Sequence, residues 1–395
     1  MRYRTDPKSK NSLSALGFGC MRFPRGAGAK TDLAKSEKLV MSAVAAGVNY
    51  FDTAYIYPGS ERTLGKILAR NPGTREKIFI ATKLPHAKCK THADFGKIFT
   101  EQLGRLGTGY IDYYLIHNLT CTEDWDRLRE MGIENWFVRE KAAGRIRRAG
   151  FSFHGAQNAF MELLDVFDWD FCMIQYNYMN ENYQAGRAGL LRANEKGLPV
   201  IVMEPLLGGK LATGLPKKAA RVFENADSTL SPATWALRWL WDQGEVTVVL
   251  SGMAGESQLA ENINAAKTAE AGSLTAREAD AIKEAASVIR ESYKIPCTGC
   301  NYCLPCPRGV NIPGCFAAYN TSYASGYITG MAQYMTSTGA ASPSKSSGAY
   351  GCTSCRACEK HCPQKIAIAD ALTKVTKRME PIWVRAAMRL ARKFM

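Results

Sequence analysis

Short apolar runs alternate with helical patterns along residues 16–267, and this alternation is the feature that most constrains the fold. Eight runs of strand length occur, and each is followed by a stretch with helical periodicity, the longest over 123–144. Eight strand–helix units in about 260 residues fit a closed parallel barrel better than an open doubly wound sheet. No G-x-G-x-x-G motif follows the first run, which disfavours a Rossmann fold. We therefore predict a (β/α)8 TIM barrel of the α/β class.

Three of these runs end next to ionisable side chains. The run 49–52 ends on Asp52 and leads to Tyr57, while two later runs lead into Lys83 and His117. Because the carboxyl ends of parallel strands meet at one rim, we expect these four side chains to lie together. Taken singly, each residue also has an ordinary structural explanation, such as a surface tyrosine or a capped core histidine.

The four residue types together predict proton transfer to an oxyanion. An ammonium beside a phenol stabilises phenolate, so we expect Lys83, held by Asp52, to lower the pKa of Tyr57. His117 would hydrogen-bond the substrate oxygen. The expected chemistry is protonation of an oxygen as hydride reaches a carbonyl carbon.

The segments FDTAYIYPGSERTLG, IFIATK and YIDYYLIH resemble the aldo/keto reductase family, and the match covers roughly residues 10 to 270. This resemblance implies a (β/α)8 barrel, a nicotinamide cofactor and a small carbonyl or alcohol substrate. It also implies that Tyr57 is the general acid and that Asp52, Lys83 and His117 are its partners.

The resemblance places the nicotinamide ring near the ends of the later strands. Ser152 and Gln175 would hydrogen-bond its carboxamide, and Met203 stands where the family commonly has an aromatic residue. Phe153 follows Ser152 where the family often has Asn, so one donor is missing, and His154 is only a weak substitute.

The last two barrel loops are expected to hold the rest of the dinucleotide. Adjacent glycines after the seventh strand let backbone N–H groups approach a diphosphate. The eighth loop lacks the cations that NADP-preferring members use, and it adds Glu256, so the choice between NAD(H) and NADP(H) stays open. The expected contacts in these loops are Leu206, Gly208, Gly209, Ser251, Gly252, Gln258 and Asn262.

Eight of the thirteen cysteines form two runs with the spacing of iron–sulfur ligands. The second run has the bacterial ferredoxin spacing, and the first has one residue fewer before its last cysteine. Three cysteines of a run hold one [4Fe-4S] cluster, and the cysteine before proline reaches the other. The predicted ligand sets are Cys297, Cys300, Cys303 and Cys362 for one cluster, and Cys352, Cys355, Cys358 and Cys306 for the other. Cys315 is an alternative fourth ligand, and zinc or disulfides are the alternative chemistries. This part resembles the ferredoxin-type extension on one branch of the aldo/keto reductases.

The expected domains are a barrel over 1–294, an α+β ferredoxin-like 2[4Fe-4S] domain over 295–375 and a basic amphipathic helix over 376–395. A helix from Ala276 to Tyr293 would close or connect the barrel.

The net charge is +15, and residues 296–395 carry 12 Lys and Arg against 3 Asp and Glu. Because bound clusters are anionic, part of this excess compensates them, so nucleic acid is not an expected partner. The last helix could make a weak peripheral membrane contact or dock on protein.

Clustered cysteines indicate a reducing cytoplasm, and the polar N-terminus argues against a signal peptide.

The favoured hypothesis is an oxidoreductase that transfers hydride between nicotinamide and a carbonyl or alcohol, coupled or adjacent to the clusters. The first alternative is an electron-transfer protein whose clusters serve a redox partner while the barrel binds a ligand without carbonyl reduction. The second is a non-enzymatic binding protein. Clusters carry single electrons whereas nicotinamide carries hydride, and although no flavin motif is visible, a flavin is not excluded.

Overall fold

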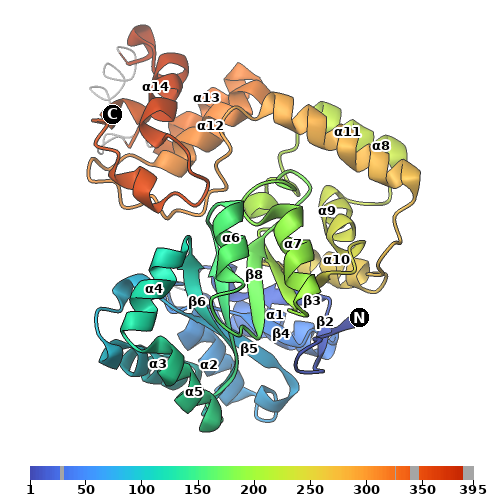
Figure 1. Cartoon of the computed structure of the whole chain (residues 1–395). Coiled ribbons are helices and arrows are strands. Elements are labelled where there is room, and N and C mark those ends of the chain that lie inside the picture. The colour runs from blue at the N-terminus through green and yellow to red at the C-terminus, as the bar shows by residue number, and fades with distance from the viewer. Residues whose placement is uncertain (27–30, 325, 339–346, 386–395) are drawn as a thin grey trace. The chain divides into compact units, whose positions relative to one another are not determined.

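The computed structural model describes residues 1–26, 31–324, 326–338 and 347–385 (Figure 1). Two compact units are present, Met1–Leu206 with Ala233–Thr275, and Leu207–Pro232 with Ala276–Met395. The sequence-based barrel domain, 1–294, therefore includes two segments, 207–232 and 276–294, that pack within the second unit. The functional boundaries at 294 and 375 stay predictions.

The first unit is built on a closed barrel of eight parallel strands, which confirms the predicted (β/α)8 fold. Around the barrel the strands follow in the order β10, β3, β4, β5, β6, β7, β8 and β9. Each strand is buried on both faces, which explains why it reads as a short apolar run. The strands are β3 Leu16–Gly19, β4 Tyr50–Asp52, β5 Phe79–Leu84, β6 Ile111–Leu119, β7 Ile146–Phe153, β8 Phe171–Gln175, β9 Val200–Met203 and β10 Val246–Ser251.

Aromatic side chains fill the barrel interior. The Tyr113 ring meets Phe171 edge-on at 5.0 Å and Tyr50 at 5.2 Å between ring centroids. The hydroxyl of Tyr113 donates to Asp6 Oδ2 at 2.9 Å, in the connection between β1 (Tyr3–Thr5) and β2 (Ser12–Ser14). These two strands pair as an antiparallel hairpin.

Helices surround the barrel, and a second hydrophobic layer lies between them and the strands. The helical region predicted over 123–144 consists of two helices, which are separated at Gly132, a residue with a φ of 82°. The helices of this unit are α1 Leu33–Ala45, α2 Ser60–Arg70, α3 His92–Leu106, α4 Thr122–Glu130, α5 Ile133–Ala142, α6 Gln157–Leu163, α7 Gly186–Glu195, α9 Pro232–Trp241 and α10 Glu256–Ala266. Short 3-10 turns occur at η1 Cys20–Arg22, η3 Arg75–Lys77 and η4 His86–Lys88.

The second unit contains the cysteine runs. In it α8 (Lys217–Ala226) packs along α11 (Ala276–Ser292), close to the helix predicted from 276 to 293. Its remaining elements are η5 Leu207–Gly209, α12 Ile312–Ala324, α13 Tyr327–Thr338, η6 Ala349–Gly351, η7 Ala357–His361 and α14 Ile368–Met379. The described residues of this unit form helices and loops, and no strand is assigned among them. Of the expected α+β domain, the described residues therefore contain the helices.

Half of the range predicted for the basic C-terminal helix lies outside the described residues. The range 376–395 begins inside α14, and residues 386–395 are not described. None of the helices in the described parts of the chain is both long and apolar enough to span a membrane.

Candidate functional site

Asp52 and Lys83 form a buried ion pair at the carboxyl ends of β4 and β5. Lys83 Nζ donates to both Asp52 carboxylate oxygens, at 2.6 and 2.7 Å, and to the Thr53 carbonyl at 2.8 Å. The side chains are 1% and 6% exposed. Burial raises the pKa of the Asp52 carboxyl, against the opposing effect of the Lys83 charge. Because each ammonium proton has an acceptor, Lys83 is held in one orientation.

Tyr57 and His117 lie beside this pair, so the structure brings the four predicted residues together. Lys83 Nζ is 4.9 Å from the centroid of the Tyr57 ring, which is the geometry of a cation over a ring face. The His117 and Tyr57 rings meet edge-on, with 5.9 Å between centroids and an interplanar angle of 87°.

The expectation that Lys83 lowers the pKa of Tyr57 is wrong for this geometry. Burial raises the pKa of Tyr57 well above its ordinary value, and the negative charges of Asp52 and Glu204 raise it further. In this structure burial and the negative charges outweigh the stabilisation that the Lys83 charge offers to a phenolate. Tyr57 is therefore a neutral phenol that carries a proton to donate.

His117 is also neutral. Burial lowers its pKa well below the ordinary value, and the Lys83 charge lowers it further. Its Nδ1 atom is buried without a hydrogen-bond partner among the described residues. A neutral imidazole can donate one hydrogen bond without adding charge to the site.

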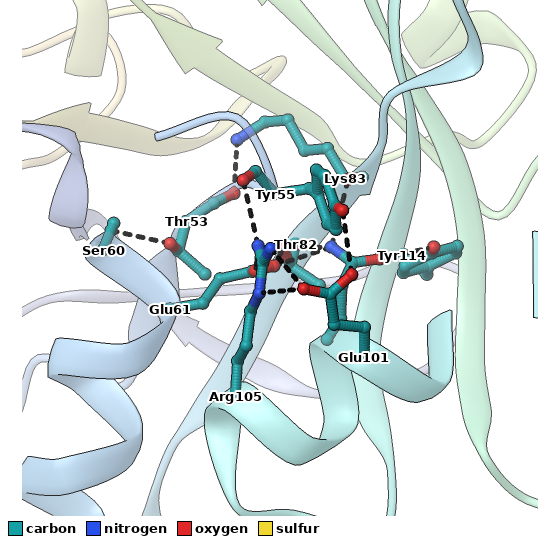
Figure 2. A network of polar contacts seen from close by, with 10 residues as sticks. Thr53, Tyr55, Ser60, Glu61, Thr82, Lys83, Glu101, Arg105 and Tyr114 are labelled. Atoms are coloured by element: carbon teal, nitrogen blue, oxygen red, sulfur yellow. Dashed lines mark hydrogen bonds and ion pairs between the residues drawn. The ribbon is translucent and has the colours of Figure 1, made fainter. Parts of the chain in front are cut away.

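A buried polar network lies behind Lys83 (Figure 2). Glu61 Oε1 accepts hydrogen bonds from Thr82 Oγ1 and Gln102 Nε2, both at 2.7 Å. Gln102 Nε2 also donates to the Lys83 carbonyl at 3.1 Å. Glu61 and Gln102 come from α2 and α3, so two helices fix the backbone at the end of β5.

The same network reaches the segment that carries Tyr57 (Figure 2). Arg105 Nη1 donates to Glu61 Oε2 at 2.9 Å and to the Tyr55 carbonyl at 3.1 Å. The contact requires close approach of α2 and α3, because a Cβ on Gly65 would lie 2.2 Å from the Arg105 carbonyl oxygen. Sequence reasoning missed this network, although Glu61 on the apolar face of an amphipathic helix was a signal.

Gln175 is a buried amide without a protein partner. It is 0% exposed, and neither its Nε2 nor its Oε1 has a hydrogen bond within the described residues. Leaving such groups unpaired costs free energy, so the position suits a ligand that both donates and accepts, as a carboxamide does.

Asn118 was not predicted, and it lies next to Ser152. Its backbone N–H donates to Ser152 Oγ at 2.8 Å, and its Oδ1 is buried without a partner among the described residues. A φ of 65° turns this residue at the end of the site-bearing strand β6. Phe153 is fully buried, while His154 Nδ1 lies 3.1 Å from Gln184 Oε1.

The other predicted cofactor residues are partly engaged within the chain. Asn262 Nδ2 donates to Ser251 Oγ at 2.9 Å, and the exposed Gln258 accepts from the Ala254 N–H at 2.9 Å. Met203 and Leu206 are half-buried. Gly208 and Gly209 have φ values of 70° and 97° and belong to the second unit.

Cations approach the eighth loop from other parts of the chain. The Arg22 side chain packs 3.2 Å from where a Cβ of Gly252 would stand. Lys38 pairs with Glu256 at 2.8 Å in an exposed contact. Inspecting the loop sequence alone missed both residues.

Two cavities in the second unit are each lined by four thiols, grouped as the spacing predicts. We call them the Cys362 cavity, lined by Cys297, Cys300, Cys303 and Cys362, and the Cys306 cavity, lined by Cys306, Cys352, Cys355 and Cys358. Ile312 lines both. No three His, Cys, Asp or Glu side chains of the described chain converge on a single-ion site, and none of the thirteen cysteines forms a disulfide. A set of four thiols fits a [4Fe-4S] cluster.

Cys315 lines neither cavity. It is fully buried, and its thiol donates to Tyr334 Oη at 3.8 Å. Burial raises its pKa to about 12, so it stays a protonated thiol.

Comparisons with known proteins agree with both the barrel and the cysteine-lined cavities. The model of the aldo/keto reductase family matches residues 15–286, and that of the 4Fe-4S dicluster domain matches 296–367. The 6-dehydroglucose reductase of Novosphingobium aromaticivorans is 27% identical over 287 residues, covering 65% of this chain and 87% of its own. Morphine 6-dehydrogenase of Pseudomonas putida is 33% identical over 110 residues, 27% of this chain and 33% of its own. The holo form of aldo-keto reductase AKR11C1 from Bacillus halodurans matches with a TM-score of 0.60 and 26% identity, covering 72% of this chain and 96% of that one.

Proposed function

The chain belongs to the aldo/keto reductase family of nicotinamide-dependent oxidoreductases and carries a ferredoxin-type 4Fe-4S domain, and from this premise we propose that it transfers hydride between nicotinamide and a small carbonyl or alcohol. The observation that carries the proposal is the buried Asp52–Lys83 pair, with Lys83 Nζ 4.9 Å from the Tyr57 ring centroid. Tyr57 acts as the general acid in this proposal.

A bound nicotinamide would supply the hydride, and the chain's own residues handle the oxygen. Neutral His117 orients the carbonyl oxygen by a hydrogen bond. Tyr57 gives its proton to that oxygen as negative charge develops there. The Lys83 ammonium over the ring stabilises the phenolate that forms, and Asp52 keeps Lys83 oriented.

Gln175, Ser152 and Asn118 are the residues that we propose for the carboxamide of the nicotinamide. The two orphaned amide atoms of Gln175 support this assignment, because a carboxamide offers both a donor and an acceptor. The three side chains lie at the ends of three neighbouring strands, β6, β7 and β8.

Two [4Fe-4S] clusters are proposed for the Cys362 and Cys306 cavities. They would supply one-electron chemistry, since each cluster exchanges single electrons. Cys355 is exposed at the rim of the Cys306 cavity, which supports exchange with a redox partner protein. This exposure also favours the second candidate function, electron transfer with a barrel that binds its cofactor without reducing carbonyls.

Tyr57→Phe tests the first function, with Tyr55→Phe as the matched control. Tyr55 lies two residues earlier, and its hydroxyl donates to Glu101 on the surface at 2.8 Å. We expect Tyr57→Phe to lower kcat about 10²- to 10⁴-fold on a panel of small aldehydes and ketones, with nicotinamide binding retained. Tyr55→Phe should stay near wild type. Full turnover by Tyr57→Phe would refute the acid role of Tyr57, whereas absence of carbonyl turnover in the wild type as well would favour the electron-transfer function.

A further inference from the structure

Two polar side chains buried in the wall of the Cys362 cavity have no hydrogen-bond partner among the described residues. Thr298 is 3% exposed and Gln364 is 6% exposed. The orphaned atoms are the hydroxyl oxygen Oγ1 of Thr298 and the amide nitrogen Nε2 of Gln364. Both residues line the cavity together with its four thiols.

Burying donors without acceptors is unfavourable, so they indicate a group that accepts hydrogen bonds. The rest of the cavity wall is apolar apart from Asn301, and includes Ile312, Phe316 and Ile368. Within this wall, the natural acceptors are the thiolate and sulfide sulfur atoms of a bound cluster.

The Cys306 cavity has residues at the same sequence positions with different exposure. Thr298 directly follows Cys297, as Thr353 directly follows Cys352, but Thr353 is exposed. Gln364 follows a Cys-Pro pair, and its counterpart is the exposed Arg308. The two cysteine runs thus have polar residues at corresponding positions, but only those at the Cys362 cavity are buried.

We propose that Thr298 and Gln364 donate hydrogen bonds to sulfur atoms of the cluster in the Cys362 cavity and thereby raise its reduction potential. This inference rests on the proposed binding of [4Fe-4S] clusters. Reduction by an external one-electron donor adds one negative charge to the cluster and breaks no bond. Fixed donors stabilise the more negative form, and hydrogen bonds to sulfur are among the factors that set cluster potentials.

The test is a redox titration of full-length protein, purified without oxygen, with dithionite as reductant and EPR of the reduced clusters as readout. Thr298→Val and Gln364→Leu each remove a donor, while Thr298→Ser keeps the hydroxyl. Thr353→Val is the matched control in the other cavity. Each cluster should give one reduction step, or wave, in this titration. At the wild-type midpoint potential of one wave, we expect Thr298→Val to lower the ratio of reduced to oxidised cluster about tenfold. This corresponds to a fall in the midpoint potential of about 59 mV for one electron.

Thr298→Ser and Thr353→Val should leave both waves close to their wild-type positions, and Gln364→Leu should move the same wave as Thr298→Val. The proposal is overturned if neither Thr298→Val nor Gln364→Leu moves a wave while iron content stays at about eight atoms per chain. Wild-type protein with fewer clusters would instead overturn the cluster assignment itself.

A measurement on wild-type protein covers the case in which the variants do not bind iron. Reduced protein in H2O and D2O is compared by the proton hyperfine couplings of its clusters. An exchangeable proton strongly coupled to one cluster supports the proposal. Its absence in the wild type overturns it.

Discussion

Replacing Glu61 by Gln would remove the charge at the centre of the network behind Lys83. The amide oxygen can still accept from Thr82 and Gln102, which both bond Oε1 in the native protein. The amide nitrogen then faces Arg105 Nη1, which now bonds Oε2 at 2.9 Å. Two donors would meet where a charged pair had been.

The structure sets the size of the effect. A charge-assisted hydrogen bond contributes about 1.5–3 kcal/mol, and a buried partner left without its counter-charge costs about 3–5 kcal/mol. Arg105 keeps Glu101 at 2.7 Å, so the lower range applies. We expect Glu61→Gln to reduce the free energy of unfolding by about 2–3 kcal/mol.

Glu101→Gln is the matched control, because both carboxylates pair with the same guanidinium. The Glu101 side chain is 42% exposed whereas that of Glu61 is 2% exposed. Exposed pairs contribute little, so Glu101→Gln should lower stability by less than about 1 kcal/mol.

Urea unfolding followed by tryptophan fluorescence measures the difference, since six of the seven tryptophans lie between residues 125 and 241. We also expect Glu61→Gln to lower kcat, because the Lys83 and Tyr55 carbonyls lose part of their anchoring. Equal losses of stability in the two variants would refute the reasoning.

Three further predictions concern other parts of the chain. Burial lowers the pKa of His154 to about 4, so between pH 6.5 and 4 the unfolded chain binds a proton that the native state does not. The free energy of unfolding should therefore fall by about 3 kcal/mol on acidification through this window. In melts followed by fluorescence, His154→Asn should make stability less dependent on pH. Gln175→Leu should weaken nicotinamide binding about tenfold in fluorescence titrations while raising stability by about 1 kcal/mol, because it removes an unpaired buried amide; stronger binding would contradict the assignment. Cys362→Ser should lower the iron and sulfide bound per chain, whereas Cys315→Ser, which lies outside both cavities, should not.

Features set by local spacing were predictable from the sequence. Strand-length apolar runs predicted the barrel, and their ends predicted that Asp52, Lys83 and His117 would meet. The cysteine spacing predicted which four thiols would line each cavity, because three closely spaced cysteines of a run surround one centre and the cysteine before proline reaches the other.

Features that depend on packing were not predictable. The burial of Glu61 and Gln102 follows from how closely α2 approaches α3. The pKa of Tyr57 depends on how desolvation competes with the Lys83 charge, and a sequence gives neither depth nor orientation. Asn118 escaped notice because its position beside Ser152 depends on a backbone turn with positive φ.

The isoleucine shared by the two thiol-lined cavities has a consequence for how electrons would be stored. With clusters bound as proposed, Ile312 would stand beside both centres, so the two clusters would be near enough in one unit to exchange electrons with each other. The pair would then equilibrate as a single two-electron reservoir. That capacity equals the number of electrons carried by one hydride.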